Sequence, residues 1–437
     1  MDILVRVAQL LLSLSILVIF HEMGHFAFAK LFKTRVEKFY LFFNPWFSLF
    51  KIKWGETEYG IGWLPLGGYV KISGMIDESM DKEAMKLPPQ PWEFRTKPSW
   101  QRLLIMIGGV LVNFILALFI YVMILTIWGR EYLPTDNLKY GIMVDSVGQQ
   151  IGLRNGDKII SVCNRKVEDF TRIVPELLLN DPKSIQVQRG NQIVDIPINS
   201  EKENLIVNNG KPLISFRTHF IVGGFAKDSP AEKAGVKVDD QIIGINDSST
   251  VFFDEFANLV KPYKGQEIKV KVLRSDEEKI FNIKVTDEGM IGVERVIDFE
   301  KEFGLKTIKY TFFKAIPAGI TIGYQAISDQ VKQLKLIPKH ADKLGGFITI
   351  GKIFPKTWDW ERFWNLTAML SVMLAVLNLL PIPALDGGHV LFLLVEMVSG
   401  RKPSEKFLEY AQIVGLVLLF SLLIFVNGND IFRLFKH

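Results

Sequence analysis

The chain has 437 residues, of which 49% are hydrophobic and 23% are charged. This length allows two or three domains, and the apolar content predicts a protein with both membrane-spanning and water-exposed parts. The net charge of +5 is too small to indicate a nucleic-acid partner, and a single cysteine, Cys163, excludes an internal disulfide. We expect Cys163 to be a small core residue.

The first apolar segment, residues 7–29, contains the motif HExxH at residues 21–25. On a helix, two histidines four positions apart lie on one face and can share a metal ion, and the adjacent Glu22 can act as a base toward water. At about 1.5 Å per residue, His21 lies about 14 Å and His25 about 8 Å below Lys30, the first cation after the segment. Ionisable groups at that depth are costly, and metal binding is one way to neutralise them. The alternative is two ordinary helix histidines near a membrane interface.

Four apolar segments predict four membrane spans, and the charges between them predict their orientation. The loop from residue 30 to residue 102 is rich in lysine and arginine, including Lys82 and Lys86, whereas only Arg6 precedes the first span. By the positive-inside rule this loop is cytoplasmic, both termini are outside, and residues 129–360 face outward. No small-residue cleavage site follows the first span, so we interpret it as a signal anchor.

A strand-like piece that is apolar and rich in glycine lies within the cytoplasmic loop at residues 59–72. It is too short to span a membrane, and it could form a hairpin that dips toward the first helix. A free strand edge there would suit a substrate that is unwound from a helix before it is cut. An ordinary surface hairpin is the alternative.

The outward segment contains an internal repeat. Residues 141–164 align without a gap to residues 224–247, and the matches include Asp157 with Asp240. Each unit has the glycine, the acidic turn and the Ile-Ile strand typical of a PDZ module. Such modules capture extended peptides, but they could equally act as steric filters. After the repeat, residues 310–327 form a fairly apolar stretch that Lys314 and Pro317 interrupt, and we expect an interfacial or amphipathic helix there.

A third metal ligand is expected at the end of the third span. Pro381 and Pro383 prevent a continuous helix there, and unwound backbone inside a membrane must border protein or a polar cavity. Asp386 follows these prolines and could complete a zinc site with His21 and His25, because a catalytic zinc needs three protein ligands and one open position. His389 could support the ligands, although a packed interfacial histidine is the simpler interpretation.

Together these motifs resemble the site-2 protease family of intramembrane metalloproteases, in its bacterial RseP type with tandem PDZ domains. The resemblance covers essentially the whole chain. It implies one Zn²⁺ per chain held by His21, His25 and Asp386, with Glu22 as the general base of a zinc endopeptidase. It also implies that Asn378, and the loop with Gly67, Gly68 and Tyr69, hold the substrate strand. Asn113 lies where relatives carry a small-residue and asparagine motif, but the usual proline is missing, so we expect Asn113 to contribute to helix packing.

The expected fold is a polytopic α-helical membrane protein with four transmembrane helices and two β-rich PDZ-like domains inserted between the second and third helices. The expected boundaries are 1–32 for the first helix, 33–102 for the cytoplasmic loop with a membrane-associated hairpin, 103–128 for the second helix, 129–215 and 216–300 for the PDZ-like domains, 301–360 for linker helices, 361–400 for the third helix and 408–427 for the fourth.

The expected function is regulated intramembrane proteolysis in a bacterial inner membrane, with the PDZ-like domains in the periplasm. The resemblance implies substrates such as membrane anti-sigma factors or remnant signal peptides, whose ectodomains the PDZ-like units bind or exclude. Two other classes stay open. One is a non-catalytic membrane scaffold, although neither ligand nor base is missing from the sequence; the other is a protease that cuts soluble peptides from the cytosol.

Overall fold

The computed structural model describes residues 2–75, 88–341 and 344–435. Residues 76–87 of the expected cytoplasmic loop, with Lys82 and Lys86, therefore lie outside the described part. The chain divides into two compact units, Met1–Gly129 with Lys309–His437 and the inserted Arg130–Ile308. The apolar segments fall in the first unit and the sequence repeat in the second.

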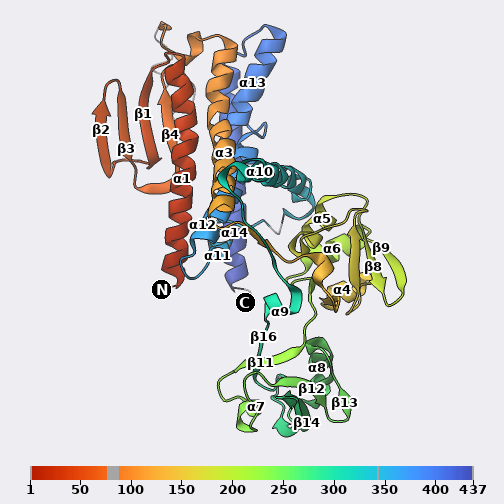
Figure 1. Cartoon of the computed structure of the whole chain (residues 1–437). Helices are drawn as coiled ribbons and strands as arrows, with labels where there is room; N and C mark the ends of the chain where they lie inside the picture. The colour runs from red at the N-terminus through yellow and green to blue at the C-terminus, as the bar shows by residue number, and fades with distance from the viewer. Residues whose placement is uncertain (1, 76–87, 342–343, 436–437) are drawn as a thin grey trace. The chain divides into compact units, whose positions relative to one another are not determined.

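The first unit is built around a helical bundle, in which α3 packs against α1, α12 and α13 (Figure 1). Apolar side chains such as Leu17, Ile120 and Phe363 are buried where these helices meet. The helices of this unit are α1 (Asp2–Leu31), α3 (Ser99–Ile127), α10 (Phe312–Leu334), α11 (Phe347–Ile353), α12 (Trp360–Asn378), α13 (Asp386–Ser399) and α14 (Glu405–Phe435).

Three helices of the described chain are long and apolar enough to cross a membrane, within residues 2–31, 99–127 and 406–433. The expected third span, 361–400, is not one continuous helix. It is divided into α12 and α13 by an irregular stretch, in which Ala384 has a left-handed backbone with φ of 78°. The two prolines account for the break, because neither can continue the hydrogen-bond ladder of α12. The helix expected at residues 310–327 corresponds to α10, which continues through Pro317 to Leu334.

A four-stranded sheet lies beside α1 in the first unit, with the strand order β2-β3-β1-β4 (Figure 1). Its strands are β1 (Val36–Phe43), β2 (Phe50–Trp54), β3 (Thr57–Ile61) and β4 (Leu64–Ile72). The prediction of a hairpin at residues 59–72 is wrong in its pairing, since β3 and β4 each pair with β1 on opposite sides. The chain crosses the end of β1 at Gly62, where a side chain would collide with the backbone of Phe42 and Phe43. The described strands leave the outer edge of β4 unpaired, and β4 packs against α1.

The second unit contains two hydrophobic cores. The first draws mainly on residues 133–214 with Phe303 and includes the buried Cys163, as expected; the second draws on residues 220–291. The strands and helices are β5 (Arg130–Tyr132), β6 (Ile142–Val144), α4 (Ser146–Ile151), β7 (Lys158–Val162), α5 (Ile173–Leu179), β8 (Ser184–Arg189), β9 (Gln192–Pro197), α6 (Ser200–Asn208), β10 (Ile214–Phe216), β11 (Phe220–Phe225), α7 (Pro230–Lys233), β12 (Gln241–Ile245), β13 (Ser248–Ser249), α8 (Phe253–Leu259), β14 (Glu267–Arg274), β15 (Glu277–Lys284), β16 (Val293–Val296), α9 (Phe299–Phe303) and β17 (Lys306–Ile308).

The sequence repeat corresponds to a repeated piece of structure around its aspartates. Asp157 accepts two hydrogen bonds of 2.8 Å from Arg189, and Asp240 accepts two of 2.6 Å from Arg274. In both copies the same arginine also donates to the carbonyl of the glycine that ends the preceding helical turn, at 2.9 Å. The repeated aspartate is thus structural: it ties the turn before one core strand to an arginine on a neighbouring strand.

Candidate metal centre

Helix α1 presents the HExxH motif toward the interior of the bundle. His21 and His25 are 8% and 7% exposed, and their Nε2 atoms lie 3.3 Å apart. The Nδ1 atom of His25 lies 2.9 Å from the carbonyl oxygen of Ile105 on α3. Since that oxygen can only accept, Nδ1 carries the proton and the lone pair of Nε2 is left free to bind a metal.

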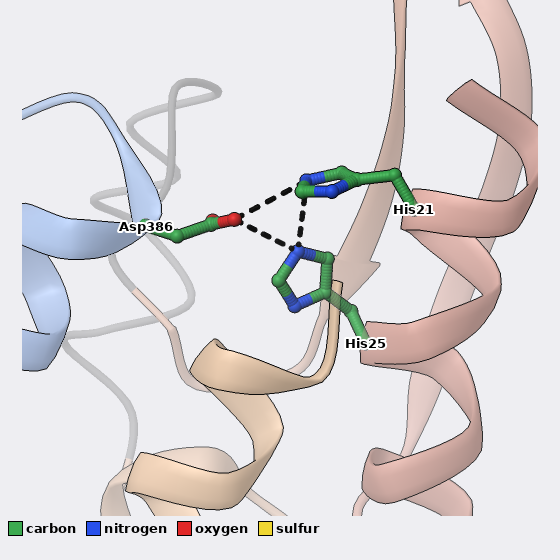
Figure 2. Close-up of side chains that lie close together, drawn as sticks. All are labelled: His21, His25 and Asp386. Carbon is green, nitrogen blue, oxygen red and sulfur yellow. Dashed lines mark hydrogen bonds and ion pairs between the residues drawn. The ribbon is translucent and has the colours of Figure 1, made fainter. Parts of the chain in front are cut away.

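Asp386, the first residue of α13, joins the two histidines (Figure 2). Its Oδ2 atom lies 3.2 Å from Nε2 of His21 and 3.4 Å from Nε2 of His25. This oxygen is buried, and no N–H or O–H group in the described part of the chain donates a hydrogen bond to it. Within the described residues, His21, His25 and Asp386 form the group of side chains that could hold a metal ion.

The geometry of these three atoms fits zinc. With zinc-ligand distances of about 2.0–2.2 Å and tetrahedral angles, ligand atoms lie about 3.3 Å from one another. The observed separations between the three donor atoms are 3.2, 3.3 and 3.4 Å. An oxygen that is buried without a donor is costly unless something neutralises it, and a cation at the centre of the triangle would do so. Three protein ligands leave a fourth position open, as catalytic zinc sites require.

Glu22 points from the same helix toward strand β4. Glu22 as a whole is half-buried, and its carboxyl accepts a hydrogen bond from the backbone N–H of Val70. At Gly68, β4 comes so close to α1 that an added Cβ would lie 2.7 Å from the side chain of Val18 and 3.4 Å from that of Glu22. The unpaired edge of β4 therefore runs beside the candidate base.

The other expected substrate-binding residues lie in different surroundings. Asn378, at the end of α12, has its Nδ2 atom 3.3 Å from Nε2 of His21, so its carboxamide borders the metal centre. Tyr69 instead stacks on Tyr40 and Phe43, and its hydroxyl donates to Asn44 at 2.9 Å. Gly67 lies against the ring of Phe43. The structure thus places Asn378 and Gly68 at the site, whereas the side chain of Tyr69 packs against other side chains of the sheet.

Helix α3 contributes residues to the site that were not expected from the sequence. Asn113 is fully buried, as expected for helix packing, and its Nδ2 atom also lies 3.2 Å from Nδ1 of His21. A Cβ on Gly109 would lie 2.5 Å from Nε2 of His25. The signal available in the sequence was an asparagine within an apolar span, because polar groups there are costly without a function. His389 is half-buried on the first turn of α13.

These features define a class of protein, a membrane-embedded metallohydrolase. The family model described as Peptidase family M50 matches residues 9–422. The chain therefore belongs to Peptidase family M50, the site-2 protease family.

Relatives of full length agree with this assignment. The chain is 27% identical to the regulator of sigma E protease of Haemophilus influenzae, over 99% of this chain and 100% of that protein. It is 28% identical to the regulator of sigma-E protease RseP of Salmonella typhimurium, over the same shares of both chains. A Neisseria meningitidis protein named as a zinc metalloprotease is 27% identical over 97% of this chain and 98% of its own length. The protein is an integral membrane zinc metalloprotease, and the predicted family, enzyme class and Zn²⁺ cofactor are confirmed.

Proposed function

We propose that the protein cuts peptide bonds within transmembrane segments of other membrane proteins. The observation that carries this proposal is the cluster of His21, His25 and Asp386, whose donor atoms are 3.2–3.4 Å apart. The first two of these residues belong to a helix long and apolar enough to cross a membrane. A protease whose metal ligands lie within such a helix meets substrates that are themselves in the bilayer.

The chemistry follows from the residues around the cluster. Zinc, when bound, supplies a Lewis acid that activates water and polarises the scissile carbonyl. Glu22 takes the proton from the attacking water and passes it to the leaving amine, and its position next to His21 in the motif supports this role. The Nδ2 atom of Asn378 can donate a hydrogen bond to a substrate carbonyl beside His21.

Strand β4 is the proposed guide for the substrate. A transmembrane helix hides its peptide bonds, so a scissile segment must become extended before it is cut. The unpaired outer edge of β4 offers backbone hydrogen bonds to such a segment, beside Glu22 at Gly68 and Val70. We infer that Gly67 and Gly68 serve because they have no side chains. Gly67 leaves room for the ring of Phe43, and Gly68 lets β4 lie close to α1. Tyr69 supports the strand by stacking on its neighbours.

The proposed arrangement in the membrane has four spans, with the divided pair α12 and α13 as the third. The excess of cations between residues 30 and 102 supports a cytoplasmic location for that loop and an outward, periplasmic location for the second unit. The repeated aspartate-arginine pairs support two related modules of PDZ type in that unit. The names of the two relatives, both regulators of sigma-E protease type, support a role in regulating a sigma factor. We therefore propose a bacterial inner membrane as the location, and membrane anti-sigma factors or remnant signal peptides as substrates. The modules would either bind substrate ectodomains or exclude large ones.

The test is Glu22→Gln in the full-length protein, assayed with a model single-span substrate in liposomes. Because glutamine cannot take a proton from water, cleavage should fall at least about 100-fold while the protein still binds one zinc. Glu56→Gln is the matched control, since Glu56 lies on the exposed turn between β2 and β3 and pairs with Lys30. Cleavage that persists in Glu22→Gln would contradict the role of Glu22 as the base, and a wild-type protein that cuts nothing would favour a non-catalytic scaffold.

A further inference from the structure

Asn113 is the one residue of α3 whose side chain lies within hydrogen-bond distance of a candidate zinc ligand. It is 0% exposed, and its Nδ2 atom lies 3.2 Å from Nδ1 of His21. Its Oδ1 atom is also buried and has no hydrogen-bond partner. A carboxamide in this position is expensive to bury, so its contact with the histidine calls for a functional explanation.

The chemistry of His21 determines what Asn113 must supply. Nε2 of His21 faces Asp386 and His25, so this nitrogen needs a free lone pair to bind a metal. In a neutral imidazole the proton then resides on Nδ1, which becomes a donor and requires an acceptor. An amide NH₂ cannot accept. A half-turn of the carboxamide exchanges its oxygen and nitrogen, places Oδ1 opposite Nδ1, and gives the unpartnered oxygen a donor.

Helix α3 then holds both histidines in the same way. Ile105 offers its carbonyl oxygen to Nδ1 of His25 at 2.9 Å, and Asn113 offers a side-chain oxygen to Nδ1 of His21. Gly109 lies midway between them on the same face of the helix, and the absence of a side chain there leaves room for both imidazoles. The backbone at Asn113 is itself fixed, because Ser371 of α12 donates to its carbonyl oxygen at 2.8 Å.

We propose that Asn113 is a positioning residue that accepts a hydrogen bond from His21 and so holds its Nε2 lone pair toward the metal. This inference rests on the metal site of the proposed function. It predicts that the acceptor at residue 113 sets zinc affinity, independently of any substrate. Outer partners of ligating histidines typically contribute about 10- to 100-fold to metal affinity.

The experiment measures zinc affinity of the full-length, metal-stripped protein in detergent, by competition with a chromophoric chelator. Asn113→Leu keeps the side-chain size and removes the acceptor, so affinity should fall about 10- to 100-fold. Asn113→Asp restores an acceptor and should recover most of that loss. Thr367→Val is the matched control: Thr367 is fully buried and hydrogen-bonded to Ser13 between α12 and α1, away from the ligands, and its loss should leave zinc affinity unchanged. The absorption spectrum of the Co²⁺-substituted protein gives a second readout, which should change in Asn113→Leu and return in Asn113→Asp.

Two results would overturn the role of Asn113. One is a folded Asn113→Leu protein with wild-type zinc affinity; the other is an Asn113→Asp protein that binds zinc as weakly as Asn113→Leu. The metal site itself is tested separately by His21→Asn. If His21→Asn binds zinc as tightly as the wild type, the proposed metal site fails, and the role of Asn113 fails with it. If His21→Asn abolishes binding while Asn113→Leu has no effect, only the role of Asn113 fails.

Discussion

Gly109 is the residue of α3 that lies against the imidazole rings of both His21 and His25. An added Cβ would lie 2.5 Å from Nε2 of His25 and 2.8 Å from Nδ1 of His21, closer than carbon and nitrogen can approach. Both imidazoles would have to move, and the triangle of donor atoms would open. A single methyl group at this position therefore acts on the metal site rather than on the fold of the helix.

We predict that Gly109→Ala lowers zinc affinity by about tenfold or more, because displaced ligands no longer meet at zinc-ligand distances. The measurement is chelator competition on the purified protein. Gly428→Ala is the control, since Gly428 lies in the long helix α14 with open space around it. Equal zinc affinity in the two alanine variants would show that the glycine is not needed for ligand geometry.

Asp240 lies in the inserted unit directly before strand β12, and it is 1% exposed. Burial raises the pKa of this carboxyl, but hydrogen bonds from Arg274 and from the backbone N–H of Lys237 outweigh it and hold the pKa below its ordinary value. A carboxyl whose pKa is lowered by folding stabilises the protein above its unfolded-state pKa, and this contribution is lost as the pH falls through the folded-state pKa.

Asp240→Asn should therefore destabilise the second core of the inserted unit at pH 7, and the difference from wild type should shrink below about pH 4. Hydrogen exchange of the β12 and β14 amides at several pH values measures it. Asp276→Asn, at an exposed position in the turn between β14 and β15, is the control. A difference that does not depend on pH would show that the carboxylate charge is not what matters.

At the scale of elements, a buried ion pair joins the helix that carries Asp386 to the centre of the bundle. Arg102 of α3 donates to Glu396 of α13, and these residues are 8% and 9% exposed. Arg102 also donates to the carbonyl oxygen of Lys97, at 3.0 Å. Because both charges are buried, neither can be removed alone without leaving the other unpaired.

Glu396→Ala should lower the free energy of unfolding by about 3–5 kcal/mol, since it leaves Arg102 buried without its counter-charge. The double variant Arg102→Met with Glu396→Leu removes both charges and should recover most of that stability. Thermal unfolding in detergent provides the comparison. If the double variant is as unstable as Glu396→Ala, the pair contributes through its shape rather than its charge.

The elements differ in how far the sequence predicted them. The HExxH helix and the break before Asp386 were predictable, because a charged motif in an apolar run and two prolines are local signals. The sheet was predicted only in part. The apolar residues 59–72 were interpreted as one hairpin, whereas β1 lies between β3 and β4. Pairing between strands depends on contacts that are distant in sequence, so composition alone does not specify it.

The same limit explains what was missed at the site. Asp386 could be proposed as a ligand, because a charged residue after an unwound stretch of a span requires a partner. Asn113, Gly109 and the carbonyl of Ile105 act through the packing of α3 against α1. The sequence shows a small residue and an amide four positions apart, but not which helix they face.

At the scale of the whole molecule, the chain combines a helical unit that holds the metal ligands with an inserted β-rich unit of two cores. The ligands come from two ends of the sequence, α1 and α13, and the inserted unit lies between them in the chain. We propose that this helical unit, whose His21, His25 and Asp386 would hold the zinc, cuts peptide bonds that lie within the bilayer.

Mass spectrometry of the cleavage products tests that claim most directly. Wild-type protein and Glu22→Gln are each placed in liposomes with a single-span substrate, and the new termini of the products are mapped. We predict termini within the apolar span of the substrate for the wild type, and none for Glu22→Gln. Termini confined to the water-exposed flanks, or identical products from both proteins, would contradict it.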